Sequence, residues 1–138
     1  MSRKKAFALI NVFILSLFFV KAAICQTELT MWWHAAGEPA QMALVKELVD
    51  EFNASQSEWK VVITAFPQIA YNDAVVAAGL AGTLPDIIDI DGPILPNWAW
   101  AGYIQPLDID ESLIANYLPG PKGVWDDKLY GIGTVSYT

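Results

Sequence analysis

The fold class is decided by residues 77–91, AAGLAGTLPDIIDID, which lead from a helix into a strand. The small residues at 71–81 predict a helix, and Gly82 is a natural residue to end it because glycine adopts the left-handed backbone conformation without a steric cost. A Leu-Pro turn then leads into residues 86–91, an isoleucine-rich run that predicts a strand. This segment therefore indicates a helix and a strand in close succession.

The same alternation extends toward the N-terminus. Residues 28–33, ELTMWW, predict a strand buried in the middle of a sheet, and residues 59–66 predict a second strand rich in β-branched residues. Between them, residues 40–53 carry apolar side chains at spacings of three and four, which is typical of an amphipathic helix that packs one stripe on a sheet. The residues of that stripe are Leu44, Val45, Leu48, Val49 and Phe52.

A helix also follows the third strand. Gly92 and Pro93 open it, and we expect it to run through residue 101 and to end at Gly102. The chain thus repeats strand and helix three times, which indicates parallel strands with crossover helices, an α/β fold. In open sheets of this kind ligands bind beyond the carboxyl ends of the strands. We therefore expect the functional chemistry in the loops at residues 33–37 and 91–93.

The C-terminal residues predict shorter elements. Residues 107–112 provide a cap for a short helix at 113–117. Residues 125–130, WDDKLY, predict a hairpin whose turn is formed by the two aspartates. A further strand starts within residues 131–138, and the sequence stops inside it. We therefore expect this chain to be a fragment.

Residues 1–25 have the pattern of a secretory signal peptide. A basic start precedes about 15 mostly apolar residues, and small residues follow up to Cys25. The apolar run is shorter than the roughly 20 residues that a helix needs to cross a bilayer, so a retained membrane anchor is the less favoured alternative. We expect cleavage after Cys25, with Ala22 as another cleavage site. Lipid attachment at Cys25 is an alternative that the bulky Ile24 disfavours.

Removal of this segment changes the charge balance. Residues 26–138 keep four lysines, no arginine and all 15 acidic residues, a net charge of −11 against −7 for the whole chain. Such a surface repels phosphate backbones and anionic lipids, so we expect no nucleic-acid partner. The expected location is the periplasm or the extracellular space, and the single cysteine leaves the exported part without a disulfide.

Four ordered segments resemble one known family. Residues 29–34, LTMWWH, with the acidic helix ending at 51–53, are similar to the start of a mature solute-binding protein of the maltose-binding type. Residues 77–88 resemble the most characteristic segment of that family, in which a small-residue helix leads through Gly and Pro-Asp into the third strand. Residues 99–108 and 127–132 resemble the two segments that follow. The family comprises the extracellular, family-1 carbohydrate-binding subunits of ABC importers.

The resemblance implies a two-lobed protein that is much longer than this chain. Residues 26–138 would supply the N-terminal part of lobe 1, a periplasmic-binding-protein-like (type II) lobe with a mixed, largely parallel sheet. The implied function is to bind a mono- or oligosaccharide between the lobes and to deliver it to the membrane permease of an ABC importer. The implied protein is a monomer that is not an enzyme and holds neither a cofactor nor a metal.

The resemblance also implies ligand contacts by position. These contacts are Trp33 and His34 after the first strand, Asp91 and Gly92 after the third strand, and Tyr137. At Tyr137 this sequence departs from the family, whose members commonly have an acidic residue there, so a carboxylate contact is lost. A second departure is Gly133, where a proline is common.

Each of these residues also has a structural interpretation. Trp33 ends a buried strand and fits a core position, and His34 fits a plain loop residue. Asp86 fits a turn or capping role, whereas Asp89 could point into the sheet or toward the cleft. Two tryptophans two positions apart in one helix, Trp98 and Trp100, point to different faces, so we expect one in the core and one at the rim.

The residue types suit a sugar better than a charged ligand. Carboxylates accept hydrogen bonds from hydroxyl groups, and aromatic rings cover the apolar faces of a pyranose. One alternative is a glycoside hydrolase, because D86-x-x-D-x-D91 resembles a hydrolase strand motif. That motif needs a glutamic acid at the position of Pro93 to protonate the leaving group, and proline cannot do so. The other alternative is a carbohydrate-interaction module without a transport role.

Overall fold

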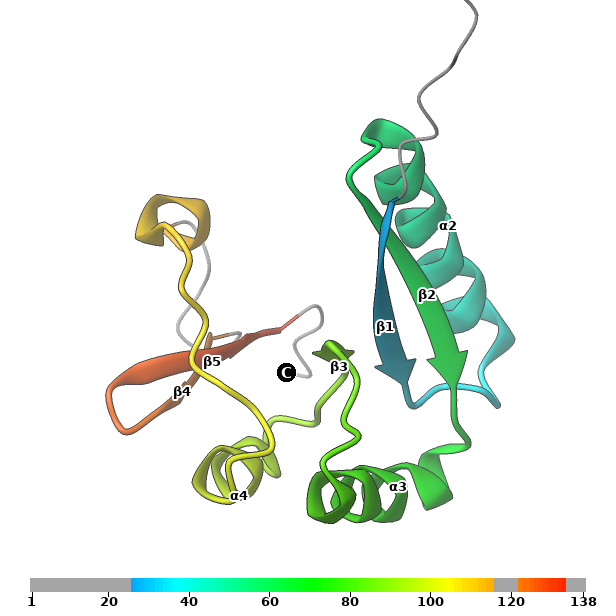
Figure 1. Cartoon of the computed structure of the whole chain (residues 1–138). Helices are drawn as coiled ribbons and strands as arrows, with labels where there is room; N and C mark the ends of the chain where they lie inside the picture. The colour runs from blue at the N-terminus through cyan, green and yellow to red at the C-terminus, as the bar shows by residue number, and fades with distance from the viewer. Residues whose placement is uncertain (1–25, 116–121, 134–138) are drawn as a thin grey trace, which may run out of the picture.

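The computed structural model describes residues 26–115 and 122–133. Along these residues, strands and helices alternate as expected and a hairpin follows (Figure 1). The elements are β1 (Thr27–Trp33), α2 (Pro39–Ser55), β2 (Trp59–Ala65), α3 (Gln68–Ala81), β3 (Ile87–Ile88), α4 (Leu95–Trp100), the 3₁₀ helix η2 (Glu111–Ile114), β4 (Lys122–Trp125) and β5 (Lys128–Ile132).

β1 is the central strand of a three-stranded parallel sheet with the order β2-β1-β3. It pairs with β2 along its whole length. It pairs with β3 through two residues only, Met31 with Ile87 and Trp32 with Ile88. The α/β class with a largely parallel sheet, and the central place of the first strand, are therefore confirmed.

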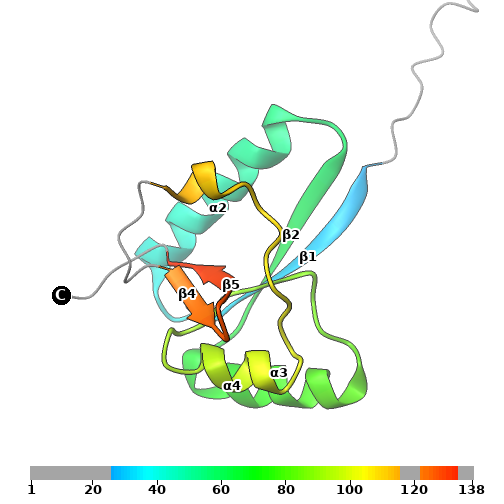
Figure 2. The ribbon, with the colours of Figure 1, turned by 90° about the vertical axis from the view of Figure 1, so that its left-hand side faces the viewer.

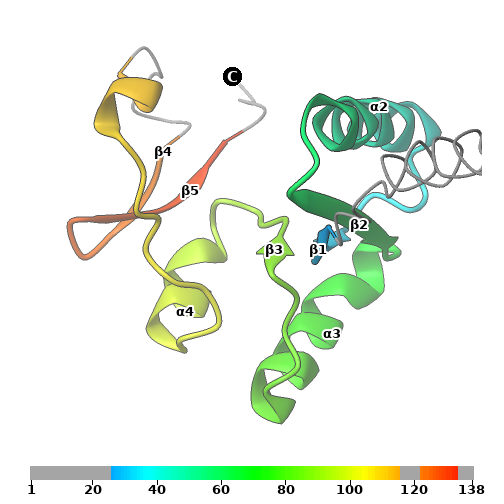
Figure 3. The same cartoon turned by 45° about the horizontal axis from the view of Figure 1, so that its top comes forward.

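Helices cover both faces of this sheet, with α2 on one side and α3 on the other (Figure 3). Successive residues of a strand point to opposite faces. Trp33 accordingly belongs to a buried cluster with Val45 of α2, whereas Trp32 packs on the cluster of Tyr71 and Val75 of α3. Within this second cluster, the side chain of Val75 is fully buried.

The face of α2 that packs on the sheet is narrower than the sequence predicts. Val45 is buried and Val49 is half-buried, but Leu44 and Leu48 are 56% exposed and Phe52 is 43% exposed. Leu44 and Leu48 are offset around the helix from Val45 and so lie beside its contact with the sheet, whereas Phe52 lies on nearly the same side as Val45 and its exposure has no such explanation. The prediction was therefore wrong for these three residues.

α3 and α4 both end at glycines with a left-handed backbone, Gly82 with φ +69° and Gly102 with φ +74°. In each case the glycine N–H and the next N–H donate back to carbonyls of the last turn, a Schellman motif. The predicted ends of the two helices are confirmed. Their starts differ, because α3 begins at Gln68, directly after Pro67, and α4 begins at Leu95.

β3 is much shorter than the predicted strand at residues 86–91. It runs alongside only the last part of β1, and β1 ends at Trp33, so the residues after Asp89 have no strand left to pair with. Asp89 still donates its N–H to the carbonyl of Trp32 at 3.0 Å. The following residues project beyond the sheet as a loop, which places Asp91 there.

β4 and β5 form an antiparallel hairpin that lies apart from the main sheet (Figure 1) and next to α4 (Figure 2). The predicted turn is confirmed, because Asp126 and Asp127 both have positive φ, 50° and 57°, as a type I′ turn requires. Gly123 and Gly131 face each other across the hairpin, where a side chain at either position would meet the end of Leu95 from α4.

Two predictions near the C-terminus need correction. The short helix expected at 113–117 is a 3₁₀ turn at Glu111–Ile114, capped by Asp110, whose Oδ1 accepts from Ser112 N–H at 2.8 Å. Gly131 and Ile132 belong to β5 and do not start a new strand, and residues 134–138 lie outside the described residues. In the described part of the chain, no helix has the length and apolar character to span a bilayer.

Candidate ligand-binding site

Three polar side chains meet beyond the carboxyl ends of β1 and β3. His34 directly follows β1, and Asp89 and Asp91 lie in the loop after β3. The two strands are parallel neighbours, so their ends point the same way and their loops lie side by side. The sheet topology thus brings together residues 55 and more positions apart in the sequence.

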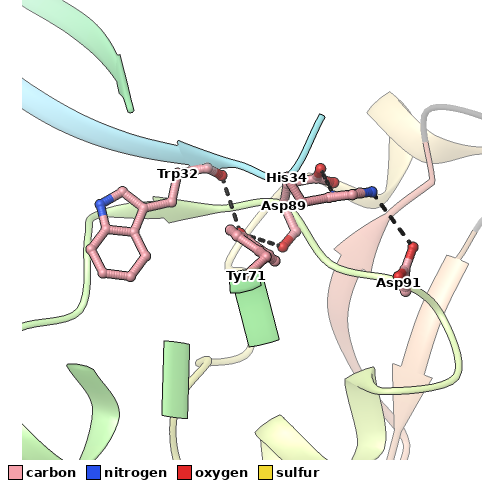
Figure 4. Close-up of polar contacts among 5 residues, drawn as sticks. All are labelled: Trp32, His34, Tyr71, Asp89 and Asp91. Carbon is pink, nitrogen blue, oxygen red and sulfur yellow. Dashed lines mark hydrogen bonds and ion pairs between the residues drawn. The ribbon is translucent and has the colours of Figure 1, made fainter. Parts of the chain in front are cut away.

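His34 lies between the two carboxylates (Figure 4). Its Nδ1 contacts Oδ2 of Asp89, and its Nε2 lies 3.9 Å from Oδ1 of Asp91. The side chains of His34 and Asp89 are 16% and 15% exposed, whereas that of Asp91 is 52% exposed. One carboxylate therefore faces the interior, and the other faces solvent.

Tyr71 of α3 fixes this arrangement from below. Its hydroxyl donates to the carbonyl of Asp89 at 2.7 Å and lies 3.2 Å from the carbonyl of Trp32, as Figure 4 shows. Its ring packs against the imidazole of His34, with 5.5 Å between the ring centroids. Tyr71 is 3% exposed, so this hydrogen bond is shielded from water.

The electrostatics follow from this burial. Burial raises the pKa of Asp89 above its usual value of 3.8, and the nearby charge of Asp91 adds to the increase, while the contact with His34 opposes it. Burial also raises the pKa of the Tyr71 hydroxyl, with a further contribution from the charge of Asp89. Tyr71 therefore remains a protonated donor throughout the physiological range.

The other predicted contacts lie in different surroundings. Trp33 is 8% exposed and packs in the cluster facing α2, and within the described residues its indole Nε1 has no hydrogen-bond partner. Gly92 is exposed in the turn that leads into α4, where its carbonyl accepts from Leu95 N–H at 3.3 Å. Tyr137 lies outside the described residues.

The sequence of residues 47–138 matches the model of the bacterial extracellular solute-binding proteins. This chain belongs to that family. It is a family of binding proteins and not of enzymes, in agreement with the expectation from the sequence.

Relatives of this solute-binding protein are found among both sequences and structures. An uncharacterized lipoprotein from Streptomyces antibioticus is 28% identical over 99 residues, which are 71% of this chain and 22% of that protein. The sugar-binding protein MalE from Xanthomonas citri shares 25% identity with a TM-score of 0.63, over 76% of this chain and 27% of its own. The cyclic α-maltosyl-1,6-maltose-binding protein from Arthrobacter globiformis shares 26% identity with a TM-score of 0.65, over 75% and 27%.

This solute-binding protein chain spans about a quarter of the length of the relatives that it matches. The similarity to the MalE-like structures agrees with the periplasmic-binding-protein-like fold that the sequence predicts.

Sequence reasoning did not assign a role to two residues of this solute-binding protein. Asp89 could be placed on a strand, but its direction depends on where β1 ends relative to β3. Tyr71 stood in the sequence only as part of a helix of small residues. Its size among alanines and valines was the available signal, because a large polar ring in such a helix needs a buried partner.

Asp91 is the exposed member of the cluster in this solute-binding protein. Two hollows of about 640 and 630 Å³ lie elsewhere, one between η2 and the hairpin and one between β3 and β5, and neither is lined by His34, Asp89 or Asp91. Within residues 26–115 and 122–133, no group of three or more His, Cys, Asp or Glu side chains is placed to hold a metal ion. The cluster offers hydrogen-bond acceptors on an exposed wall.

Proposed function

We propose that residues 26–138 form the N-terminal part of the first lobe of an exported sugar receptor. In this proposal residues 1–25 are a signal peptide, and the full-length protein binds a mono- or oligosaccharide and delivers it to the permease of an ABC importer. Family membership supports the solute-binding role, and the names of two similar structures, a sugar-binding protein and a maltosyl-maltose-binding protein, support a carbohydrate.

The observation that carries the proposal is the cluster of His34 and Asp91 at the carboxyl ends of adjacent parallel strands. Asp91 is half-exposed and its carboxylate is available to accept from ligand hydroxyl groups. No arginine or lysine lies among the proposed contacts, which are Trp33, His34, Asp91, Gly92 and Tyr137. A neutral ligand rich in hydroxyl groups satisfies these acceptors, whereas an anionic ligand would meet like charge.

The exposure of Asp91 supports a mechanism in which a second lobe covers the ligand. A ligand on this wall would stay largely in water, and a second lobe closing over it would remove that water and strengthen each hydrogen bond. The closed form is then the one that the importer recognises, so the sugar selects the state that delivers it. This part of the chain provides one wall of the cleft.

A titration of the full-length protein tests the function. Intrinsic tryptophan fluorescence is followed while maltose, maltotriose, maltotetraose and a xylo-oligosaccharide are added, and calorimetry then gives the dissociation constant of any sugar that responds. Saturable binding of at least one sugar is expected. If none of these sugars binds while the protein is folded, the carbohydrate assignment is wrong.

Two variants connect binding to this site. Asp91→Ala is expected to weaken binding by about 1–3 kcal/mol, as for a lost hydrogen bond to a charged acceptor. Asp50→Ala, on the exposed face of α2 near the opposite end of the sheet, removes the same charge and is the matched control. Equal affinities of the two variants would exclude Asp91 from the site.

A further inference from the structure

The contact between Asp89 and His34 determines which imidazole nitrogen carries the proton. A neutral imidazole has one N–H and one bare nitrogen, and the partner at one nitrogen selects the tautomer. Oδ2 of Asp89 is buried, has no assigned hydrogen-bond partner among the described residues, and lies in contact with His34 Nδ1. An ionised carboxylate only accepts hydrogen bonds, so this contact favours the proton on Nδ1. Nε2 is then a bare acceptor.

The backbone of Asp89 is held in place on both sides. Its N–H donates to the carbonyl of Trp32 at 3.0 Å, and its own carbonyl accepts from the buried hydroxyl of Tyr71 at 2.7 Å. The carboxylate therefore projects from a fixed point toward His34. The imidazole in turn packs against the ring of Tyr71, which limits its rotation.

On the other side of the ring, the distance between Nε2 and Asp91 determines what this tautomer means for ligand binding. Nε2 and Oδ1 of Asp91 are 3.9 Å apart, beyond hydrogen-bond range, so two acceptors face each other across a gap. A ligand that presents two hydroxyl donors, such as a vicinal diol, satisfies both. With the proton on Nε2, this nitrogen would be a donor and could not accept a hydrogen bond from a ligand hydroxyl group.

We propose that Asp89 is a positioning residue of the ligand site, which holds the proton of His34 on Nδ1 and so keeps Nε2 and Asp91 available to two hydroxyl groups of one ligand. The effect of Asp89 on ligand affinity rests on the proposed function, whereas its effect on the His34 tautomer is independent of that function. The charged and titratable groups that face His34 in the described residues are Asp89 and Asp91, from the loop after β3, and Tyr71, from α3.

Nitrogen NMR of the full-length protein, labelled with ¹⁵N-histidine and measured without ligand at a pH where the ring is neutral, reads the tautomer directly. The His34 signal is assigned by its loss in His34→Gln. The wild type is expected to show the Nδ1–H tautomer, and the Nε2–H tautomer in the wild type would overturn the proposal without any further variant.

Three variants separate positioning from packing. Asp89→Leu keeps the approximate size but removes the acceptor, so the signal is expected to shift to the Nε2–H form. Asp89→Asn keeps a carbonyl oxygen and is expected to restore the Nδ1–H form. Asp91→Asn is expected to leave the tautomer unchanged, because its side chain does not contact Nδ1. A folded Asp89→Leu protein with the wild-type tautomer would contradict the proposal.

Calorimetry with maltotriose as the probe tests the consequence for binding. Asp89→Leu is expected to weaken the affinity by about two- to tenfold, as for one lost hydrogen bond between a ligand hydroxyl and the neutral Nε2, and Asp89→Asn to recover most of it. Wild-type affinity in Asp89→Leu would overturn the positioning role. If the wild type binds no sugar, the proposed function fails, while the tautomer still decides whether Asp89 positions the ring.

Discussion

Replacing Tyr71 by phenylalanine removes one hydroxyl group from the interior without removing the ring. That hydroxyl is the donor to the carbonyl of Asp89 at 2.7 Å, in a side chain that is 3% exposed. The carbonyl of Trp32, 3.2 Å away, still accepts the N–H of Asp89, so only one carbonyl loses its partner. A lost buried hydrogen bond together with an unsatisfied carbonyl costs about 1–3 kcal/mol.

Urea unfolding of the full-length protein, followed by circular dichroism, measures this loss. Tyr103→Phe is the matched control, because in the described part of the chain the Tyr103 ring packs against Gly79 while its hydroxyl forms no hydrogen bond. We expect a change within about 0.5 kcal/mol for this control. If the two variants are equally stable, the Tyr71 hydroxyl does not hold the loop after β3, and Asp89 is not fixed by this hydrogen bond.

Three further results are expected. Burial raises the pKa of Asp89 above 3.8, so between these two pH values the folded state retains a proton that the unfolded chain has lost. The stability that this group contributes therefore falls as the pH rises from 3.8 through the raised pKa. Urea titrations across that window should show this fall in the wild type and not in Asp89→Asn. Gly79→Ala would place a methyl group 2.5 Å from the Tyr103 ring and should destabilise the folded protein by about 1–3 kcal/mol, whereas Gly37→Ala, with open space around it, should not. Equal thermal midpoints of the two variants would show that the Tyr103 ring does not pack tightly against Gly79. Mass spectrometry of the exported protein should find a chain that starts at Gln26, and a lipid-bearing Cys25 as the first residue, in line with the lipoprotein name of the Streptomyces relative, would replace that prediction.

The helix ends and the hairpin turn could be predicted from the sequence, because each depends on a few neighbouring residues. The two helix-ending glycines and the Asp126-Asp127 turn need a left-handed backbone, and the structure has it at all four positions. The expectation for the tryptophan pair is also confirmed, since Trp98 is 4% exposed and Trp100 is 80% exposed. In each case the requirement lies within a few residues of the signal.

The polar cluster could be predicted only in outline. The topology rule identified the loops after β1 and β3, and these loops do bring His34 and Asp91 together. The role of Asp89 depended on the point where β1 ends relative to β3, which is a property of strand register and not of local sequence. Ligand binding by the five proposed contacts stays a prediction.

The central position of β1 has a consequence for how tightly the proposed sugar ligand would be bound. β1 is hydrogen-bonded to β2 along its length and to β3 near its end, and His34 is the very next residue. Because β1 holds the backbone at His34 in place, ligand binding would cost little conformational entropy at this residue. This part of the site is therefore preorganised, and most of the entropic cost of binding would come from other parts of the protein and from the ligand. In the proposed sugar site, a change of specificity would then require different side chains on the same backbone.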